Sequence, residues 1–163
     1  MKGGLDSNLP HGQLKALDFL VGDSSGPGVL HPPNHPPVQF HGFLHVEREH
    51  SDRFLRIEFY GSSPTIGIES VHSLITYSDR LACYRMWNFS SSQDEPVEMH
   101  GDFDGCNLVF VSSPNDTVWG LQRCRVTFSP LADGVVDYLA EFWDIDGYKP
   151  YFQATYAMSK VRI

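Results

Sequence analysis

Cysteine is scarce in this chain, and its three cysteines are widely spaced. Cys83, Cys106 and Cys124 form no Cys-x-x-Cys pair, which excludes a zinc knuckle or a dithiol redox motif of that kind. Each lies within an apolar, strand-like pattern, so we predict that each is a small buried hydrophobic residue. The sequence therefore predicts no cysteine-based metal or redox site.

Long hydrophobic runs are also missing. The opening stretch MKGGLDSNLPHG lacks the apolar segment of a secretory signal. No other stretch approaches the ~18 consecutive apolar residues of a membrane-spanning helix. From these two observations we expect a cytoplasmic protein with no membrane association.

Positive charge is in short supply. The chain has 12 Lys and Arg against 20 Asp and Glu, which gives a net charge of −8. The basic residues are scattered and form no run of five or more. Because a nucleic-acid surface requires a basic patch, we expect no nucleic-acid partner.

The sequence contains no common cofactor or metalloprotease motif. The patterns GxGxxG, GxxxxGK[ST] and HExxH are absent. The chain has eight histidines, and His41 and His45 lie four residues apart on a predicted strand. That spacing separates them by roughly 13 Å, which is too far to share one ion. We therefore predict no cofactor and no metal.

A short helix and a long β region make up the rest. Residues 1–10 are polar and are predicted to be a flexible N-terminus, followed by a single domain over 11–163. Within 11–21, Leu14, Leu17 and Val21 have helical spacing, which predicts a short plug helix that ends at Gly22.

From Gly26 onward apolar residues alternate with period two, and turn residues separate the runs. The pattern predicts strands near 26–31, 38–48, 53–61, 65–77, 80–89, 96–103, 106–112, 117–128, 134–144 and 150–161. Sequential antiparallel strands hide their edges most simply by closing on themselves. We therefore predict an all-β fold, an antiparallel up-and-down barrel of about ten strands with a short N-terminal plug helix.

The alternation also predicts which side chains face inward. A turn at Asp104-Gly105 would pair Phe103 with Cys106 and Met99 with Phe110. The inward set predicted in the other strands is Phe40, Gly42, Leu44, Val46, Leu55, Ile57, Phe59, Gln122, Cys124, Val126, Phe128, Val136, Tyr138, Ala140, Phe142, Phe152, Ala154, Tyr156 and Met158. Tyr151, Gln153 and Thr155 would face water.

Three segments resemble a known family when taken in order: LDFLVGDSSGPGVLHP, then YRMWNF followed by GDFDGCNL, then RVTFSPLADGVVDY. The chain resembles a bacterial family of unknown function that has a calycin-like (lipocalin-related) β-barrel. The resemblance implies a barrel with a cavity, but no particular reaction. Where that family has a Trp after Gly-x, this chain has Ser24, so the closure of that barrel end is expected to differ.

The hairpin over residues 66–89 carries the candidate site. A tight turn at Ser78-Asp79 would place His72 opposite Arg85 and Ser70 opposite Trp87. The same face carries Ile66, Ile68, Leu74, Leu81 and Phe89, which suggests that it points inward. A buried Arg requires an anionic partner, and none lies on the inward set, so a ligand could supply it. In the alternative, the faces are swapped: Arg85 and His72 lie outside, and Val71, Tyr84 and Met86 lie inside.

These residues suggest a binding protein. We expect a small, mostly apolar ligand with a polar or anionic end, with Arg85 and His72 at that end and Ser70, Trp87, Gln122, Tyr138 and Tyr156 around the ligand. As an alternative, His72 as a base and Arg85 as an oxyanion partner would suit a cofactor-independent isomerase or cyclase. The sequence leaves a homodimer open.

Overall fold

The computed structural model describes residues 11–65, 67–117 and 120–159. The predicted flexible N-terminus, residues 1–10, lies outside the described residues, and so does Ile66. The elements are α1 (His11–Lys15), η1 (Asp18–Leu20), β1 (Gly22–Leu30), β2 (Val38–Glu49), β3 (Phe54–Ser63), β4 (Gly67–Ser78), β5 (Cys83–Ser90), β6 (Val97–Asp104), β7 (Asn107–Ser112), β8 (Asn115–Thr117), β9 (Gly120–Gln122), β10 (Cys124–Pro130), β11 (Val135–Asp144) and β12 (Gly147–Met158).

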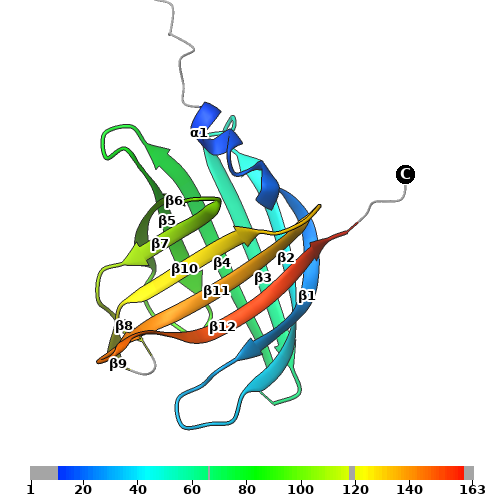
Figure 1. The fold of residues 1–163 in the computed structure, drawn as a ribbon, viewed down its shortest axis with the longest axis vertical. Helices are drawn as coiled ribbons and strands as arrows, with labels where there is room; N and C mark the ends of the chain where they lie inside the picture. The colour runs from blue at the N-terminus through cyan, green and yellow to red at the C-terminus, as the bar shows by residue number, and fades with distance from the viewer. Residues whose placement is uncertain (1–10, 66, 118–119, 160–163) are drawn as a thin grey trace, which may run out of the picture.

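Ten of these strands form one closed antiparallel barrel, as the sequence predicts (Figure 1). Their order is β1-β12-β11-β10-β7-β6-β5-β4-β3-β2, and β2 pairs with β1 to complete the ring. The strands β8 and β9 form a separate two-stranded sheet. Closure pairs the first strand with the last, so no barrel strand among the described residues is left with an open edge.

The N-terminal helical segment covers one end of the barrel (Figure 1). Leu14, Leu17 and Leu20 are fully buried there, and the hydroxyl of Tyr84 donates to the backbone carbonyl of Gln13 at 2.6 Å. The prediction of one helix over 11–21 is correct in type, but the segment divides into α1 and η1. Within the described residues, no helix has the length and apolar character needed to cross a bilayer.

The alternation of buried and exposed side chains follows the predicted period in most strands. In β2, Phe40, Leu44 and Val46 are buried and His41 is exposed. The inward sets predicted for β10, β11 and β12 also face the interior, where Val126 lies opposite Ala140 and Phe128 opposite Tyr138. The apolar core therefore fills the barrel between the plug and the cavity described below.

The β6–β7 hairpin has the predicted faces but a different register. Asp104 pairs with Asn107, so the turn consists of Gly105 and Cys106, and Gly105 has a φ of 62°. Phe103 therefore lies opposite Leu108 instead of Cys106. The pairing slips by an even number of residues, which keeps the side chains within β6 and β7 on their predicted faces.

Two of the three cysteine predictions need revision. Cys124 is buried, as predicted, and burial raises the pKa of its thiol to about 11. Cys106 is exposed because it occupies the turn, and Cys83 is partly exposed at the start of β5. The prediction of a buried residue is therefore wrong for Cys106 and only partly right for Cys83.

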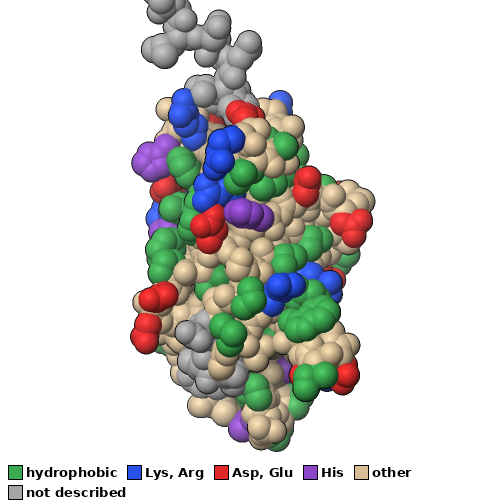
Figure 2. Space-filling model, turned by 90° about the vertical axis from the view of Figure 1, so that its left-hand side faces the viewer, with side chains coloured by type: hydrophobic (Ala, Val, Ile, Leu, Met, Phe, Trp, Pro, Cys, Tyr) green, Lys and Arg blue, Asp and Glu red, His purple; other side chains and the backbone are tan. Residues whose placement is uncertain are grey.

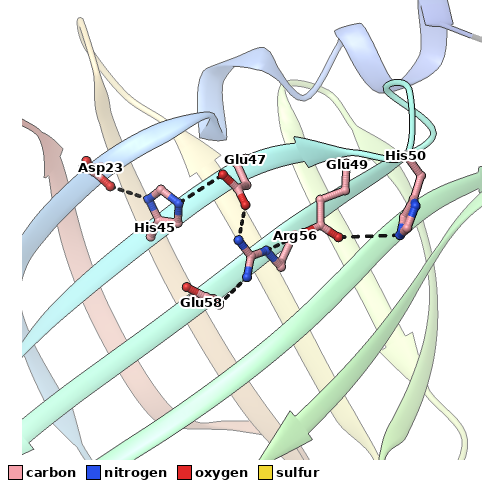
Figure 3. Close-up of polar contacts among 7 residues, drawn as sticks. All are labelled: Asp23, His45, Glu47, Glu49, His50, Arg56 and Glu58. Carbon is pink, nitrogen blue, oxygen red and sulfur yellow. Dashed lines mark hydrogen bonds and ion pairs between the residues drawn. The ribbon is translucent and has the colours of Figure 1, made fainter.

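Ion pairs link three neighbouring strands on the outer surface of the barrel (Figure 3). His45 on β2 contacts Asp23 on β1 at 2.5 Å, and Arg56 on β3 forms ion pairs with Glu47 and Glu49 on β2. Figure 2 shows acidic, basic and apolar side chains interspersed over another face. Charged side chains on the outer surface are thus arranged in local ion pairs. Several of the histidine and arginine side chains near β1–β3 take part in such pairs.

Candidate ligand-binding cavity

The β4–β5 hairpin has a wider turn than the sequence analysis predicts. Tyr77 pairs with Tyr84, and Ser78 pairs with Cys83, so residues 79–82 form a four-residue loop. Ala82 in this loop has a φ of 50°, in the left-handed region. The two-residue turn predicted at Ser78-Asp79 would instead have placed Ala82 within a strand. His72 consequently lies opposite Phe89, and the predicted pairing of His72 with Arg85 is wrong.

The face of this hairpin that points inward is the alternative one. Ser73, Ile75, Tyr84 and Met86 are buried. On the other face, Ile68 is 81% exposed and Phe89 is 46% exposed. Both faces carry apolar residues, so composition alone did not distinguish them. His72, Arg85, Ser70 and Trp87 therefore lie on the outer face and do not line the cavity.

Arg85 has a carboxylate partner on the outside of the barrel. Its guanidinium group donates to Glu98 on β6 through Nε, at 3.0 Å, and through Nη2. The guanidinium also lies over the Trp87 ring, 4.6 Å from its centroid. The hydrogen bonds from Arg85 lower the pKa of the Glu98 carboxyl, and a hydrogen bond from His100 lowers it further. Arg85 is thus paired within the protein and does not need a ligand anion.

Two other candidate residues also lie away from the cavity. The backbone N–H of Ser70 donates to Ser91 Oγ at 3.1 Å, and Ser70 pairs with the exposed Tyr60. Gln122 lies in β9 and pairs with Asn115. The single strand predicted over 117–128 is divided between β9 and β10. Neither side chain lines a cavity described here.

Tyr138 and Tyr156 do line an interior cavity, of about 100 Å³. Its walls are mainly apolar and include six aromatic rings. The lining consists of Leu44, Ile57, Phe59, Glu69, Val71, Ser73, Met86, Asn88, Phe128, Tyr138, Ala140, Tyr151, Phe152 and Tyr156. The barrel therefore encloses a small, largely apolar space with a few polar groups at defined positions.

A second space of about 110 Å³ adjoins the first and leads toward the surface. The two share six lining residues, among them Glu69, Tyr138 and Tyr151. The second also includes Ser92 in the exposed loop after β5. Glu69 lies near the start of β4, eight residues before Tyr77, a separation of roughly 26 Å along a strand. Because Tyr77 lies at the end near α1, these spaces lie toward the opposite end of the barrel.

Tyr151 joins the cavity because of an irregularity in the β11–β12 pairing. Ala140 pairs with Phe152, whereas Glu141 pairs with Pro150, so the ladder skips Tyr151. The extra residue turns the Tyr151 ring inward, next to Phe142, with 4.7 Å between the ring centroids. The prediction that Tyr151 faces water is wrong because regular alternation does not allow for a bulge.

The tyrosine hydroxyls in the cavity remain protonated at neutral pH. Burial raises the pKa of Tyr156, Tyr138 and Tyr151, and nearby groups add to the effect. Tyr156 is only 1% exposed, and its hydroxyl has no hydrogen-bond partner in the structure. A neutral phenol with an unused donor thus belongs to a residue that lines an apolar cavity.

Glu69, Ser73 and Asn88 are polar cavity residues that the sequence analysis missed. The hydroxyl of Ser92 donates to Glu69 Oε1 at 3.1 Å, and the hydroxyl of Ser73 donates to Asn88 Oδ1 at 2.6 Å. One signal could have revealed them. Glu98 precedes Met99, which was predicted to face inward, so the alternation places Glu98 outside. An outward Arg85 beside it would have placed Glu69 and Asn88 inside.

Within the described part of the chain, no group of three or more His, Cys, Asp or Glu side chains is placed to hold a metal ion. The cavity side chains are mainly carbon surfaces with oxygen atoms from Glu69, Ser73, Asn88 and the tyrosines. Chemically, this arrangement suits binding by shape and hydrogen bonds.

The fold and the cavity define a ten-stranded antiparallel β-barrel protein with an interior space. Among solved structures, the chain is similar to the crystal structure of Rv2717c from M. tuberculosis, with a TM-score of 0.64 and 14% sequence identity. The match covers 93% of this chain and 99% of that chain. At this identity the likeness shows the fold alone. No family model and no curated protein sequence matches this chain.

Proposed function

We propose that this barrel binds a small, mostly apolar molecule that carries a polar group. The observation that carries the proposal is the hydroxyl of Tyr156, which is buried without a partner on a residue that lines an apolar cavity. Leaving a buried donor unsatisfied costs about 1–3 kcal/mol. A ligand atom that accepts this hydrogen bond would recover that cost, so the cavity favours a ligand with a hydroxyl, carbonyl or ether oxygen.

The size of the cavity limits the ligand. An apolar cavity of ~150 Å³ holds one benzene ring. The two adjoining spaces, of about 100 and 110 Å³, therefore suit a single-ring molecule or an aliphatic one of similar volume. The anionic end considered from sequence loses its basis, because Arg85 lies outside. The enzyme alternative rested on His72 and Arg85 and has no support in the described cavity.

Binding of toluene and p-cresol tests this proposal, because the two differ by one hydroxyl group. We expect calorimetry to detect both, with p-cresol bound ~5-fold to 10-fold tighter, as expected for one buried hydrogen bond. In Tyr156→Phe the preference for p-cresol should disappear while toluene binding persists. If the wild-type protein binds neither compound, the proposed function is wrong.

A further inference from the structure

The charge of the cavity carries information about the ligand's second end. Glu69 lines three of the cavities among the described residues, and none of the described residues that line those three is Lys, Arg or His. Glu141 also borders the outer space, but Arg125 holds it with contacts of 2.7 and 3.1 Å. The unbalanced charge in the cavity is therefore the Glu69 carboxylate.

The Glu69 carboxylate has room for a ligand. A carboxylate can accept about four hydrogen bonds, and the Ser92 hydroxyl supplies one of them at Oε1. Ser92 is an exposed loop residue, so this bond does not withdraw Glu69 from the cavity that it lines. The charge of Glu69 also acts on the tyrosines of the cavity, since Glu69 contributes to the raised pKa of both Tyr138 and Tyr151.

Aromatic rings surround the same space. Tyr138 and Tyr151 line both spaces together with Glu69, and Phe59, Phe128 and Phe152 complete the walls of the inner one. The faces of aromatic rings attract cations, most strongly where water is excluded. A carboxylate among aromatic rings is the combination that recognises an ammonium group and repels a carboxylate.

A second polar position fixes the ligand's direction. Tyr156 lies five residues beyond Tyr151 along β12, toward the end that α1 covers, because Met158 pairs with Ser24 near the start of β1. Its buried hydroxyl has no partner, which points independently to a ligand in the same cavity. The inner end of the ligand therefore meets Tyr156, and the outer end meets Glu69.

We infer that the ligand of this barrel is a small apolar amine, whose protonated nitrogen binds Glu69 near the cavity entrance while its apolar body fills the space lined by the aromatic rings. This inference rests on the proposed function and specifies the class of ligand. No covalent step is involved.

Benzylamine and benzoate test the inference, because they share one ring and differ in the sign of their charge. At neutral pH we expect calorimetry to show benzylamine bound at least ~10-fold tighter than benzoate, as for a charge-assisted hydrogen bond against like-charge repulsion. In Glu69→Gln the benzylamine affinity should fall by about tenfold, and toluene should bind as it does to the wild-type protein.

The matched control is Asp133→Asn, which removes a negative charge from the exposed loop between β10 and β11. It should leave all the affinities unchanged. If benzoate binds the wild-type protein as well as benzylamine does while toluene binds, the inference is wrong and the proposed function stands. If benzylamine affinity survives Glu69→Gln, the inference is also wrong. If neither toluene nor p-cresol binds, the proposed function itself fails.

Discussion

Tyr84 and Tyr156 are equally buried, each 1% exposed, but their hydroxyl groups differ in what they contact. The Tyr84 hydroxyl donates to the Gln13 carbonyl and ties the plug to β5, and burial raises the pKa of Tyr84 to about 12. The Tyr156 hydroxyl has no partner. A pair of identical substitutions can therefore separate a hydroxyl that serves the fold from one that is available to a ligand.

We expect Tyr84→Phe to lower the free energy of unfolding by about 1 kcal/mol, because it removes the hydrogen bond to the Gln13 carbonyl. Tyr156→Phe should leave the ligand-free protein equally stable or stabilise it by up to about 1 kcal/mol, because it removes an unsatisfied donor. Urea unfolding measures both. Equal destabilisation by the two substitutions would show that the Tyr156 hydroxyl has a partner in the free protein.

His45 provides a pH-dependent contact on the outer surface. Its hydrogen bond to Asp23 is the main cause that raises its pKa above the ordinary value of 6.5, and Glu47 adds to it. A pKa raised in the folded state means that this contact stabilises the protein fully below pH 6.5 and that the stabilisation is lost as the pH rises through the folded-state pKa.

Asp23→Asn should therefore lower the pKa of the His45 imidazole, which NMR titration would measure. The difference in unfolding free energy between wild type and Asp23→Asn should be larger at pH 6 than at pH 8. Glu58→Gln is the control, since Glu58 contacts Arg56 in the same network. A His45 pKa at or below 6.5 in the wild-type protein would contradict the structure.

At the scale of the elements, barrel closure depends on how closely β1 approaches β12. A Cβ added at Gly26 would lie 1.8 Å from the backbone carbonyl oxygen of Thr155, which is far inside any van der Waals contact. The β1–β12 ladder has paired residues on both sides of this point, at Ser25 and Gly28. The glycine at position 26 is therefore required by the neighbouring backbone, and not by a turn.

Gly26→Ala should destabilise the protein by about 1–3 kcal/mol, since overpacking forces the strands apart. Gly12→Ala is the control, because a Cβ there would meet nothing within 4 Å. In α1 that change should be neutral or stabilising by up to about 1 kcal/mol. Thermal unfolding measures both. Equal stability of Gly26→Ala and wild type would show that β1 and β12 can separate freely.

The same scale shows what could be predicted from the sequence. Period-two alternation and turn residues predicted the ten barrel strands, because each strand has one wet and one dry face. The β4–β5 hairpin escaped prediction because Ile68 and Phe89 are apolar yet exposed, while Glu69 and Asn88 are polar yet line the cavity. In this hairpin, polar residues line the cavity and apolar residues are exposed, which is the reverse of the pattern that predicts an inward face. The inward positions of Tyr138 and Tyr156 were predicted correctly because polar residues, Asp137 and Thr155, mark the opposite faces of their strands.

At the scale of the whole molecule, the plug covers one end of the barrel (Figure 1), and the cavity residue Glu69 lies toward the other end. Leu17 belongs to the plug, is completely buried and does not line the cavity, whereas Phe59 does line it. The same barrel strands reach both ends, but no plug residue among those described lines the cavity. Stability at one end and binding at the other should thus be separable by substitution.

Leu17→Ala should cost about 2–5 kcal/mol of unfolding free energy, as for other buried leucines. Its affinity for p-cresol, measured below the unfolding transition, should match that of the wild-type protein within a factor of about two, because additivity holds for distant sites. Phe59→Ala should impair both properties. A large loss of p-cresol affinity in Leu17→Ala would show that the plug shapes the cavity.

The position of Glu69 near the cavity entrance has a practical consequence for chemical tools. If the ligand is the amine inferred above, a molecule that enters from this end leads with its ring and leaves its nitrogen near the exposed Ser92. Substituents on the ring must then fit a closed space, while those on the nitrogen extend toward solvent. An immobilised resin or fluorescent reporter should therefore be attached through the nitrogen, as a secondary amine that keeps its positive charge.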